Sequence, residues 1–521
     1  MNLFAVDEIK RKEIFILILC FIIGFALRFY TFDNKSLWID EIHTFNDSRD
    51  DLRGQLNFYK KNPTYLHPPL FFVLTHLFYP FTKPERDLRI IPLIFGTLSI
   101  PMIYFLAKSF SPHIALPCTL SLIFMVYHIG ISQDGRPYPL LLFVGMAGLY
   151  FFIKHLQTSK KTYLLLVALL FSTLFYTSYS SIPFITLSQI LWFYRPNGKA
   201  KKPTLSSFLT LNGFILLFCL PWILFVAVNY KGQTIMAPSP HTESSISFWY
   251  IMYGVLHDWA PHVPLTIASV ILLILFPIFS KFRKNAFLLL GVIFLPVGAL
   301  CLFCKLFDVG HFVTSRYFII FLPLFFITLF LSLNAIEVKF EGFRRLLRLR
   351  LLFTILFITS NLVILTPYYR SEKQDFRGLA AYLKGQLQDG DKIIVGLVEY
   401  IPGLLHYFGV DPKGRLHPIS SRKVSENEIE YTISLIMENK KFTISYSKTF
   451  WIQYILDRNR LWYVAGKNPA KEIKKVSTFI FKGYFDGSFC NFDRFPADAS
   501  MYLFLWDPKS TGEKGIDMPI E

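Results

Sequence analysis

The chain has 521 residues, of which 53% are hydrophobic and 17% aromatic, and its mean hydropathy is +0.41. This composition excludes an ordinary soluble globular protein, which has less apolar side-chain surface at this length. The formal net charge of +18 would suggest a nucleic-acid partner for a soluble protein, but much of the charge lies in short loops between apolar runs. We therefore interpret the charge as membrane topology and expect no nucleic-acid binding.

Long apolar runs recur from Ile14 to Thr366 and then stop. We predict a membrane domain over residues 1–366 and a soluble domain over residues 367–521, which is ~150 residues and usual for one domain. The soluble part opens with a helical pattern at residues 375–383. Short runs typical of strands follow at residues 392–398, 442–446, 462–465, 478–485 and 500–506. We expect a small α/β domain there.

Eleven apolar segments of the membrane domain are predicted to span the bilayer. In chain order they cover residues 14–30, 88–107, 113–131, 139–153, 163–179, 182–194, 205–229, 264–279, 287–304, 316–334 and 351–366. Residues 68–80 hold only ~12 apolar residues where a crossing needs ~20, so we expect a juxtamembrane helix there on the outer side. Residues 49–60 have apolar spacing that suits a helix lying on the membrane interface.

Basic residues set the predicted orientation. Lys10, Arg11 and Lys12 precede the first span and place the N-terminus in the cytoplasm. The assigned cytoplasmic ends carry most of the other basic residues, whereas the outer loops between residues 132 and 315 carry only Arg136, Lys231 and Lys305. We therefore expect a multi-pass protein of the cell (inner) membrane with an extracytoplasmic C-terminal domain.

This topology gathers polar residues on the outer face. They are Asp40, Glu41, His67, Asp134 and Arg136, with Arg89 and Arg316 at the outer ends of two spans. Arginines at a membrane boundary are costly unless they pair or bind an anion, and the guanidinium fork suits phosphate. A transferase that uses a lipid-linked phosphosugar needs this set. One carboxylate deprotonates an acceptor hydroxyl, and arginines stabilise the charge on the departing phosphate.

Structural roles compete with these chemical ones for four of the residues. Asp40 could be a passive acid at the start of a solvated loop. Glu41 could pair with a nearby basic residue and only hold the loop. His67 could cap the helix that follows Pro68 and Pro69, and Arg316 could be an anchor that snorkels at a helix end.

Five motifs in order carry a family resemblance. They are Trp38-Ile39-Asp40-Glu41, His67-Pro68-Pro69-Leu70, Leu88-Arg89-Ile90-Ile91-Pro92, the segment from Ser132 to Tyr138, and Arg316-Tyr317 at the start of an apolar span. Over residues 10–335 the chain resembles the GT-C glycosyltransferases of the protein O-mannosyltransferase and aminoarabinose-transferase type, glycosyltransferase family 39 and its bacterial relatives. The resemblance implies a GT-C fold and an inverting transfer of a hexose or pentose from a polyprenyl-phosphate sugar to an acceptor hydroxyl. The acceptor would be a lipid, a glycan or a protein of the cell envelope.

The resemblance also implies a role for each matching residue. Asp40 is the catalytic base and Glu41 its acidic neighbour; Arg89, Arg136 and Arg316 bind the donor phosphate; His67, Asp134 and Tyr138 contact substrate. Many relatives have Glu-Ala-Arg where this chain has Asp134-Gly135-Arg136, so its acid is one methylene shorter. No cofactor is indicated. Cys301 and Cys304 have the C-x-x-C spacing of a redox or metal motif, but they lie inside an apolar run, so we expect them to pack against lipid or other helices. A divalent cation is compatible with this chemistry but not required by it.

A transporter or flippase for lipid-linked sugars is the alternative, with the acids and arginines lining a path. A transporter should carry ionisable residues deep in several spans. Here they gather at the predicted outer ends of the spans, which favours the enzyme.

Overall fold

The computed structural model describes residues 3–61, 66–194, 204–230, 248–306, 315–340, 348–398, 400–410, 420–425, 428–446, 460–475, 478–489, 498–509 and 515–519. The chain forms two compact units. Unit 1 comprises residues 1–32 and 47–366, and unit 2 comprises residues 33–46 and 367–521. The boundary after residue 366 therefore falls where the long apolar runs stop. In addition, the segment 33–46, which carries Asp40 and Glu41, belongs to unit 2.

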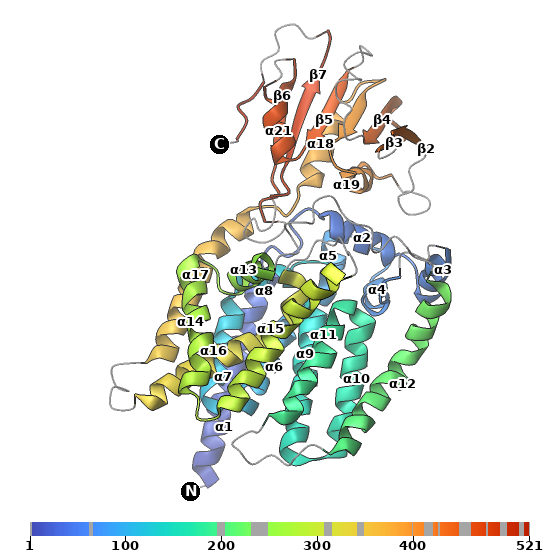
Figure 1. Ribbon diagram of the computed structural model, residues 1–521. Helices are drawn as coiled ribbons and strands as arrows, with labels where there is room; N and C mark the ends of the chain where they lie inside the picture. Colours follow the sequence, from blue (N-terminus) through green and yellow to red (C-terminus); the bar gives the residue numbers. More distant parts are fainter. Residues whose placement is uncertain are drawn as a thin grey trace. The chain divides into compact units, whose positions relative to one another are not determined.

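Unit 1 is helical throughout its described part (Figure 1). Its elements are α1 (Leu3–Phe29), α3 (Leu52–Lys61), α4 (Leu70–His76), α5 (Pro84–Asp87), α6 (Ile90–Phe110), α7 (Pro112–Phe124), α8 (Val126–Ser132), α9 (Tyr138–Thr158), α10 (Lys161–Thr177), η1 (Tyr179–Ser181), α11 (Ile182–Leu187), η2 (Ser188–Phe193), α12 (Leu205–Asn229), α13 (Phe248–Trp259), α14 (Val263–Phe279), α15 (Arg283–Leu306), η4 (Ser315–Phe321), α16 (Leu322–Lys339) and most of α17 (Leu349–Arg370).

Among the described residues, six helices are long and apolar enough to cross a membrane, or up to eight when each of two bent pairs counts as one span. The chain is therefore a multi-pass membrane protein. The three predicted spans outside this set are α1, α10 and residues 182–194. Charged residues lie near both ends of α1, α10 has only 17 residues, and residues 182–194 fold as the short α11 and η2. The number of eleven spans thus stays a prediction.

Among the long helices that could cross a membrane, α9 and α16 are the most enclosed. In each, 78% of the apolar stretch is buried, against 17% in α12. α9 packs against α6 and α10, and α16 packs against α14 and α7 (Figure 1). α12 is apolar all round yet exposes side chains such as Leu209 and Leu216. A helix with this pattern is stable only where lipid covers it.

The predicted span at residues 113–131 is bent rather than continuous. α7 ends at Phe124 and α8 begins at Val126, and the two helices meet at 61°. Met125 between them has extended backbone dihedrals, with φ −67° and ψ 109°. The bend frees the N–H of Val126, which donates to the side-chain oxygen of the buried Asn361 in α17 at 2.9 Å. Because no water is at hand among packed helices, such a break needs a partner of this kind.

Ion pairs join helices near positions that the sequence assigns to the cytoplasmic side. Glu13 in α1 pairs with Lys108 near the end of α6. Glu337 near the end of α16 pairs with Arg350 in α17 at 2.7 Å, and Arg350 also donates to the carbonyl of His113 in α7 at 2.8 Å. These contacts join an interior position of α1 to the end of α6, and they bring together the ends of α7, α16 and α17.

Unit 2 contains a seven-stranded mixed sheet in the order β2-β3-β4-β1-β5-β7-β6. Its strands are β1 (Lys392–Val395), β2 (Ser420–Ser425), β3 (Glu428–Met437), β4 (Lys440–Tyr446), β5 (Leu461–Ala465), β6 (Ile480–Phe485) and β7 (Met501–Trp506). Its helices are α2 (Ile39–Asp47), α18 (Phe376–Gln386), α19 (Tyr400–Phe408) and α21 (Lys467–Ile473). β1 runs parallel to β4 and β5, and the remaining pairs are antiparallel. The α/β prediction is confirmed, although β2 and β3 were not predicted.

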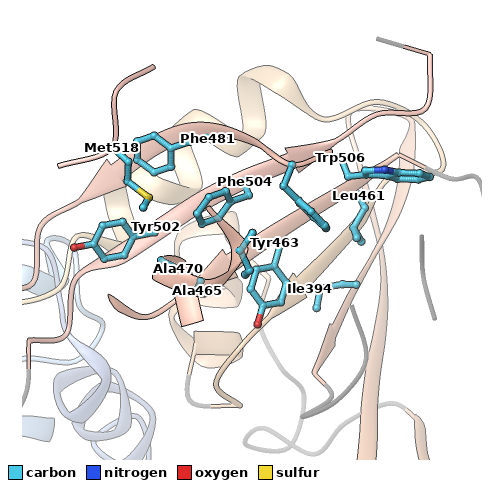
Figure 2. Packing of buried hydrophobic residues seen from close by; sticks show 12 residues of the cluster. Ile394, Leu461, Tyr463, Ala465, Ala470, Phe481, Tyr502, Phe504, Trp506 and Met518 are labelled. Carbon is cyan, nitrogen blue, oxygen red and sulfur yellow. The ribbon is translucent and has the colours of Figure 1, made fainter. Parts of the chain in front are cut away.

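Helices cover both faces of this sheet. On one face, α21 contributes Ala470 and Ile473 to a core with alternate residues of β5 and β7, which Figure 2 shows around Tyr463 and Phe504. On the other face, Trp462 of β5 meets Tyr382 of α18 at a ring-centroid distance of 6.3 Å. Because strands buried on both faces are apolar at every position, their sequences read as continuous runs rather than as an alternation.

Candidate active site

The carboxylate pair Asp40–Glu41 lies in the first turn of α2. Glu41 is fully buried, and its side chain accepts from the N–H of Trp38 at 3.4 Å. This is the reciprocal half of a capping box, in which the third helical residue satisfies the N–H of the N-cap residue. Asp40 is only partly buried. Two neighbouring acids therefore differ in environment, with Glu41 held at the start of the helix and Asp40 partly accessible.

The residues before α2 are held by the start of the C-terminal part of unit 2. The N–H of Ser36 donates to Glu372 Oε2 at 2.9 Å, and the N–H of Ile39 donates to Gln374 Oε1 at 3.2 Å. Burial raises the pKa of Glu372, while the N–H of Ser36 and the charge of Lys35 oppose that rise. The acidic helix α2 is thus tied to residues that lie more than 330 positions further along the chain.

Arg89 and the loop after α8 gather around the end of α1 in unit 1. Arg89 is the N-cap residue of α6 and is fully buried, and its guanidinium donates to the carbonyl of Phe32 at 3.0 Å. Gln133 donates from its amide to the carbonyls of Arg28 at 2.9 Å and Tyr30 at 2.6 Å. Two of the five sequence motifs, far apart in the chain, therefore meet at the end of the first helix.

Asp134 and Arg136 lie in the tight turn that follows α8. Asp134 is buried, and Arg136 is half-buried. The N–H of Arg136 donates to the carbonyl of Asp134 at 2.6 Å, which closes the turn around Gly135. The predicted donor-site arginine thus sits on a backbone that the loop itself fixes.

Arg316 and Tyr138, two predicted site residues, are in contact. The guanidinium carbon of Arg316 lies 5.8 Å from the ring centre of Tyr138, in cation–π geometry. The neighbouring residue Ser315 donates its hydroxyl to Asp258, and its Oγ lies 3.1 Å from the hydroxyl of Tyr127. Asp258 and Arg316 both interact electrostatically with Tyr127. The structure therefore adds a buried carboxylate to the surroundings of Arg316.

The remaining predicted residue, His67, is exposed and lies two positions before Pro69, the N-cap residue of α4. Among the predicted site residues, one described contact joins Arg316 to Tyr138 and another joins Arg136 to Asp134. Asp40 and Glu41 belong to unit 2, and the other six belong to unit 1.

Sequence reasoning missed several buried charged residues of unit 1, among them Asp258 and Arg28. Asp258 lies in α13, and Arg28 lies near the end of α1, where it donates to the carbonyl of Leu122 at 2.8 Å. Its Nη2 also lies 2.6 Å from Nδ1 of His128. A charged residue inside an apolar run is itself a signal, because such residues persist in membrane helices only when they are partnered or functional.

Metal binding has no support from residue grouping in the described ranges: no cluster of three or more His, Cys, Asp or Glu side chains occurs among them.

Comparison with solved structures finds a similar overall fold in the apo form of the aminoarabinose transferase ArnT from Cupriavidus metallidurans, at 11% identity over 95% of this chain and 98% of ArnT, with a TM-score of 0.50. ArnT bound to undecaprenyl phosphate matches with a TM-score of 0.49 at 11% identity, over 95% of this chain and 99% of that one. An oligosaccharyltransferase from Archaeoglobus fulgidus in complex with zinc and sulfate gives a TM-score of 0.43 at 12% identity, over 75% of this chain and 61% of that protein. No protein-family model and no curated protein matches the sequence. The chain has the GT-C fold of ArnT.

Proposed function

We propose that the chain is an inverting glycosyltransferase that moves a sugar from a polyprenyl-phosphate donor to an acceptor hydroxyl at the outer face of the cell membrane. The observation that carries the proposal is the fold shared with the aminoarabinose transferase ArnT along nearly the whole length of both chains. The five ordered sequence motifs support the same reaction class, because they resemble those of polyprenyl-phosphate-dependent transferases.

Asp40 is the base in this proposal. It is partly accessible, whereas Glu41 is buried and caps α2. The Asp40 carboxylate takes the proton of the acceptor hydroxyl, and the acceptor oxygen then forms a bond to the anomeric carbon of the sugar. The bond from that carbon to the phosphate oxygen breaks on the opposite face, and the polyprenyl phosphate leaves with the electron pair. Inversion at the anomeric carbon follows from this single displacement. A positioned base typically contributes ~10²–10⁴-fold to such a step.

Arginine side chains stabilise the leaving phosphate in the proposed reaction. Arg316 and Arg136 are both half-buried, so a phosphate can reach them while water screens them only partly. Arg89 is fully buried and already donates to the carbonyl of Phe32. We therefore assign direct phosphate contact to Arg316 and Arg136 and give Arg89 the supporting role of holding the end of α1 in place.

The experiment uses the purified chain in lipid nanodiscs with a panel of polyprenyl-phosphate monosaccharides that carry a radiolabelled pentose, aminopentose or hexose. The acceptor is a delipidated cell-envelope extract together with a separate envelope-lipid fraction. We expect enzyme-dependent release of polyprenyl phosphate and transfer of label from at least one donor. Release by the parent at the rate of empty nanodiscs for every donor and both acceptor fractions contradicts the proposal.

A further inference from the structure

The segment 33–46 leaves unit 1 after Phe32 and returns to it at Asp47. Between these points it makes its contacts with residues 367–521 as part of unit 2. The segment contains α2 and thus both carboxylates of the proposed reaction. Its geometry therefore depends on the C-terminal part of the chain.

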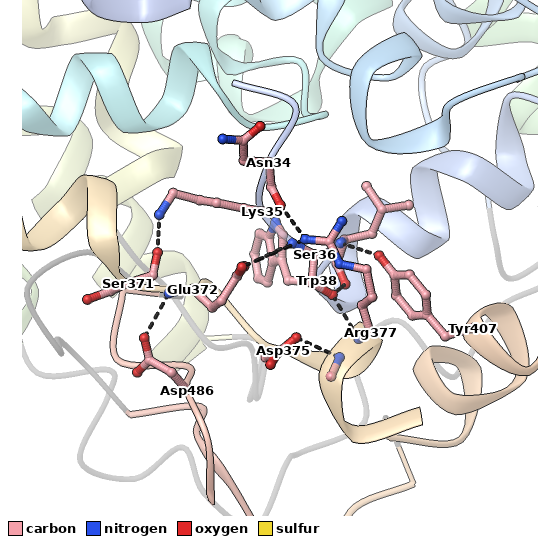
Figure 3. A network of polar contacts seen from close by, with 12 residues as sticks. Asn34, Lys35, Ser36, Trp38, Ser371, Glu372, Asp375, Arg377, Tyr407 and Asp486 are labelled. Atoms are coloured by element: carbon pink, nitrogen blue, oxygen red, sulfur yellow. Dashed lines mark hydrogen bonds and ion pairs between the residues drawn. The ribbon is translucent and has the colours of Figure 1, made fainter. Parts of the chain in front are cut away.

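Side chains accept from every backbone N–H between residues 36 and 39. Glu41 accepts from Trp38 within the segment, and the C-terminal part of unit 2 supplies the other three acceptors. The donor and acceptor pairs are Ser36 N to Glu372 Oε2 at 2.9 Å, Leu37 N to the Tyr407 hydroxyl at 2.7 Å and Ile39 N to Gln374 Oε1 at 3.2 Å. We call Glu372, Gln374 and Tyr407 the amide clamp; Figure 3 shows Glu372 and Tyr407 beside the segment that contains Ser36.

Further contacts fix the residues that precede α2. The buried Lys35 donates to the carbonyl of Tyr368 at 2.7 Å and to that of Ser371, and its ammonium lies 4.8 Å from the Tyr368 ring. Arg377 donates from its backbone to Ser36 Oγ at 3.2 Å and from its guanidinium to the carbonyl of Asn34 (Figure 3).

Asp486 in turn holds the backbone of the segment that carries Glu372 and Gln374. The N–H of Glu372 donates to Asp486 Oδ2 at 2.7 Å, and the N–H of Asp375 donates to the carbonyl of Asp486 at 2.9 Å. The end of α2 has an anchor as well, because the ring of Phe45 meets the imidazole of His406 edge-on at 4.7 Å. Contacts at both ends of α2 thus leave it little freedom to rotate or slide.

Leaving the backbone N–H groups of residues 36–39 without acceptors costs free energy, because these residues are buried or partly buried. Leu37 and Ser36 are fully buried, and Gln374 is nearly so. A buried N–H that loses its acceptor drives the local backbone to rearrange or to admit water. Rearrangement at residues 36–39 moves the first turn of α2, and the Asp40 carboxylate with it.

We propose that Glu372, Gln374 and Tyr407 are positioning residues that fix the start of α2 and so hold the Asp40 carboxylate in place for proton abstraction. This inference rests on the proposed function. A displacement of about 1 Å at a reacting group is enough to lower turnover by ~10²-fold. The C-terminal domain is therefore a working part of the transferase site, and a chain that ends at Thr366 lacks all three clamp side chains.

The test compares the full-length variants Tyr407→Phe, Gln374→Met and their double variant in nanodiscs, at a temperature at which all are folded. Tyr382→Phe and Gln386→Met are the matched controls, because both side chains lie on α18 and no described contact joins them to residues 33–46. A further pair of variants at Glu372 distinguishes the loss of the hydrogen-bond acceptor from the loss of the negative charge. Glu372→Gln keeps an oxygen for Ser36 N, whereas Glu372→Leu does not.

Two readouts are taken for each variant. One is amide hydrogen exchange over residues 33–46, and the other is kcat and KM for the polyprenyl-phosphate donor. We expect at least tenfold faster exchange and at least a tenfold lower kcat in the double variant and in Glu372→Leu, with the donor KM within twofold. The controls and Glu372→Gln should stay within twofold of the parent in both readouts.

Unchanged exchange in the double variant overturns the clamp, and faster exchange with parental kcat overturns its positioning role. A fall in kcat shared by the controls also overturns it, because the effect would then be general destabilisation. A parent that turns over none of the donors refutes the proposed function, and the positioning role falls with it. The exchange data still report in that case whether the clamp holds α2.

Discussion

At the scale of single residues, environment separates the roles of side chains that look alike in the sequence. Asp40 and Glu41 are adjacent acids, yet only Glu41 is fully buried and accepts the N–H of Trp38. Arg89 and Arg316 both flank apolar spans, yet Arg89 is fully buried and Arg316 is not. For this reason we propose that Asp40 and Arg316, rather than Glu41 and Arg89, contact the substrate directly.

Replacing Arg316 should lower turnover. The Arg316→Ala variant loses a charge beside the position proposed for the leaving phosphate, and loss of one such donor typically costs about 3–4 kcal/mol, or ~10²–10³-fold in kcat. Arg316→Lys should recover only part of this, because lysine lacks the planar fork. The measurement is single-turnover transfer, with Arg283→Ala, an exposed position at the start of α15, as the control. Parental turnover in Arg316→Ala would remove this residue from the donor site.

Glu372 should give unit 2 a dependence of stability on pH. Burial raises its pKa above the ordinary value of 4.5, so the folded state binds the proton more tightly than the unfolded chain. Its contribution to the free energy of unfolding is therefore greatest below the unfolded pKa and is lost as the pH rises through the raised folded pKa. Glu372→Gln cannot ionise and should lose this part of the dependence.

Thermal unfolding of the full chain in detergent, followed from acid to neutral pH, measures this effect. The melting temperature of Glu372→Gln should rise relative to that of the parent as the pH increases across that window. Two curves that stay parallel would show that the proton affinity of Glu372 does not differ between the folded and unfolded states.

At the scale of elements, the bend between α7 and α8 depends on one acceptor. Asn361 receives the N–H of Val126, which has no helical partner at the break. Asn361→Leu should therefore lower the free energy of unfolding by about 1–3 kcal/mol, the usual effect of leaving one buried donor unsatisfied. Denaturation in mixed detergent, followed by tryptophan fluorescence, measures this change.

Asn229→Leu is the control for that experiment, because the described hydrogen bond of Asn229 stays within its own helix, to the carbonyl of Phe225 at 2.8 Å. Its effect should be much smaller. Equal effects at the two positions would mean that the Asn361 contact adds nothing beyond the change in polarity.

Sequence patterns predict these elements unevenly. The strands β5 and β7 were predictable because burial on both faces makes them continuously apolar. The strand β3 was not predicted from the sequence. It nevertheless shows the alternation of buried and exposed side chains that is usual for a strand, with Ile433 and Leu435 buried and Ser434 exposed. The bend at Met125 was not predictable, because its partner Asn361 lies 235 positions further along the chain.

The candidate site, like the fold, could be predicted only in part from the sequence. The order of motifs made Asp40, Arg316 and Tyr138 candidates, and the structure brings the last two into contact. The amide clamp could not be found in this way. Its pairs join residues such as Ser36 and Glu372, 336 positions apart, and a side chain that accepts one backbone N–H leaves no periodic signal.

At the scale of the whole molecule, the chain alternates between its two units, entering unit 2 for residues 33–46 and again after Thr366. If unit 2 lies outside the cell, the loop after α9 should lie inside. In a variant without the six native cysteines, Glu472→Cys should react with a membrane-impermeant maleimide in intact spheroplasts. Ser159→Cys should react only after lysis. Both positions are exposed, so burial within the protein would not block the reagent at either of them. The reverse pattern would invert the topology.

The central claim is that this chain transfers a sugar from a polyprenyl-phosphate donor with Asp40 as the base. The most direct measurement is single-turnover transfer in nanodiscs by the parent, Asp40→Asn and Glu41→Gln, at equal folded protein and with the donor that the parent uses. Asp40→Asn keeps the shape of the side chain and removes its basicity, so transfer should fall by ~10²–10⁴-fold while donor binding is kept. Glu41→Gln should lose less, since it retains an oxygen for the N–H of Trp38. Near-parental transfer by Asp40→Asn would contradict the account, and an inactive Glu41→Gln beside an active Asp40→Asn would move the base by one residue.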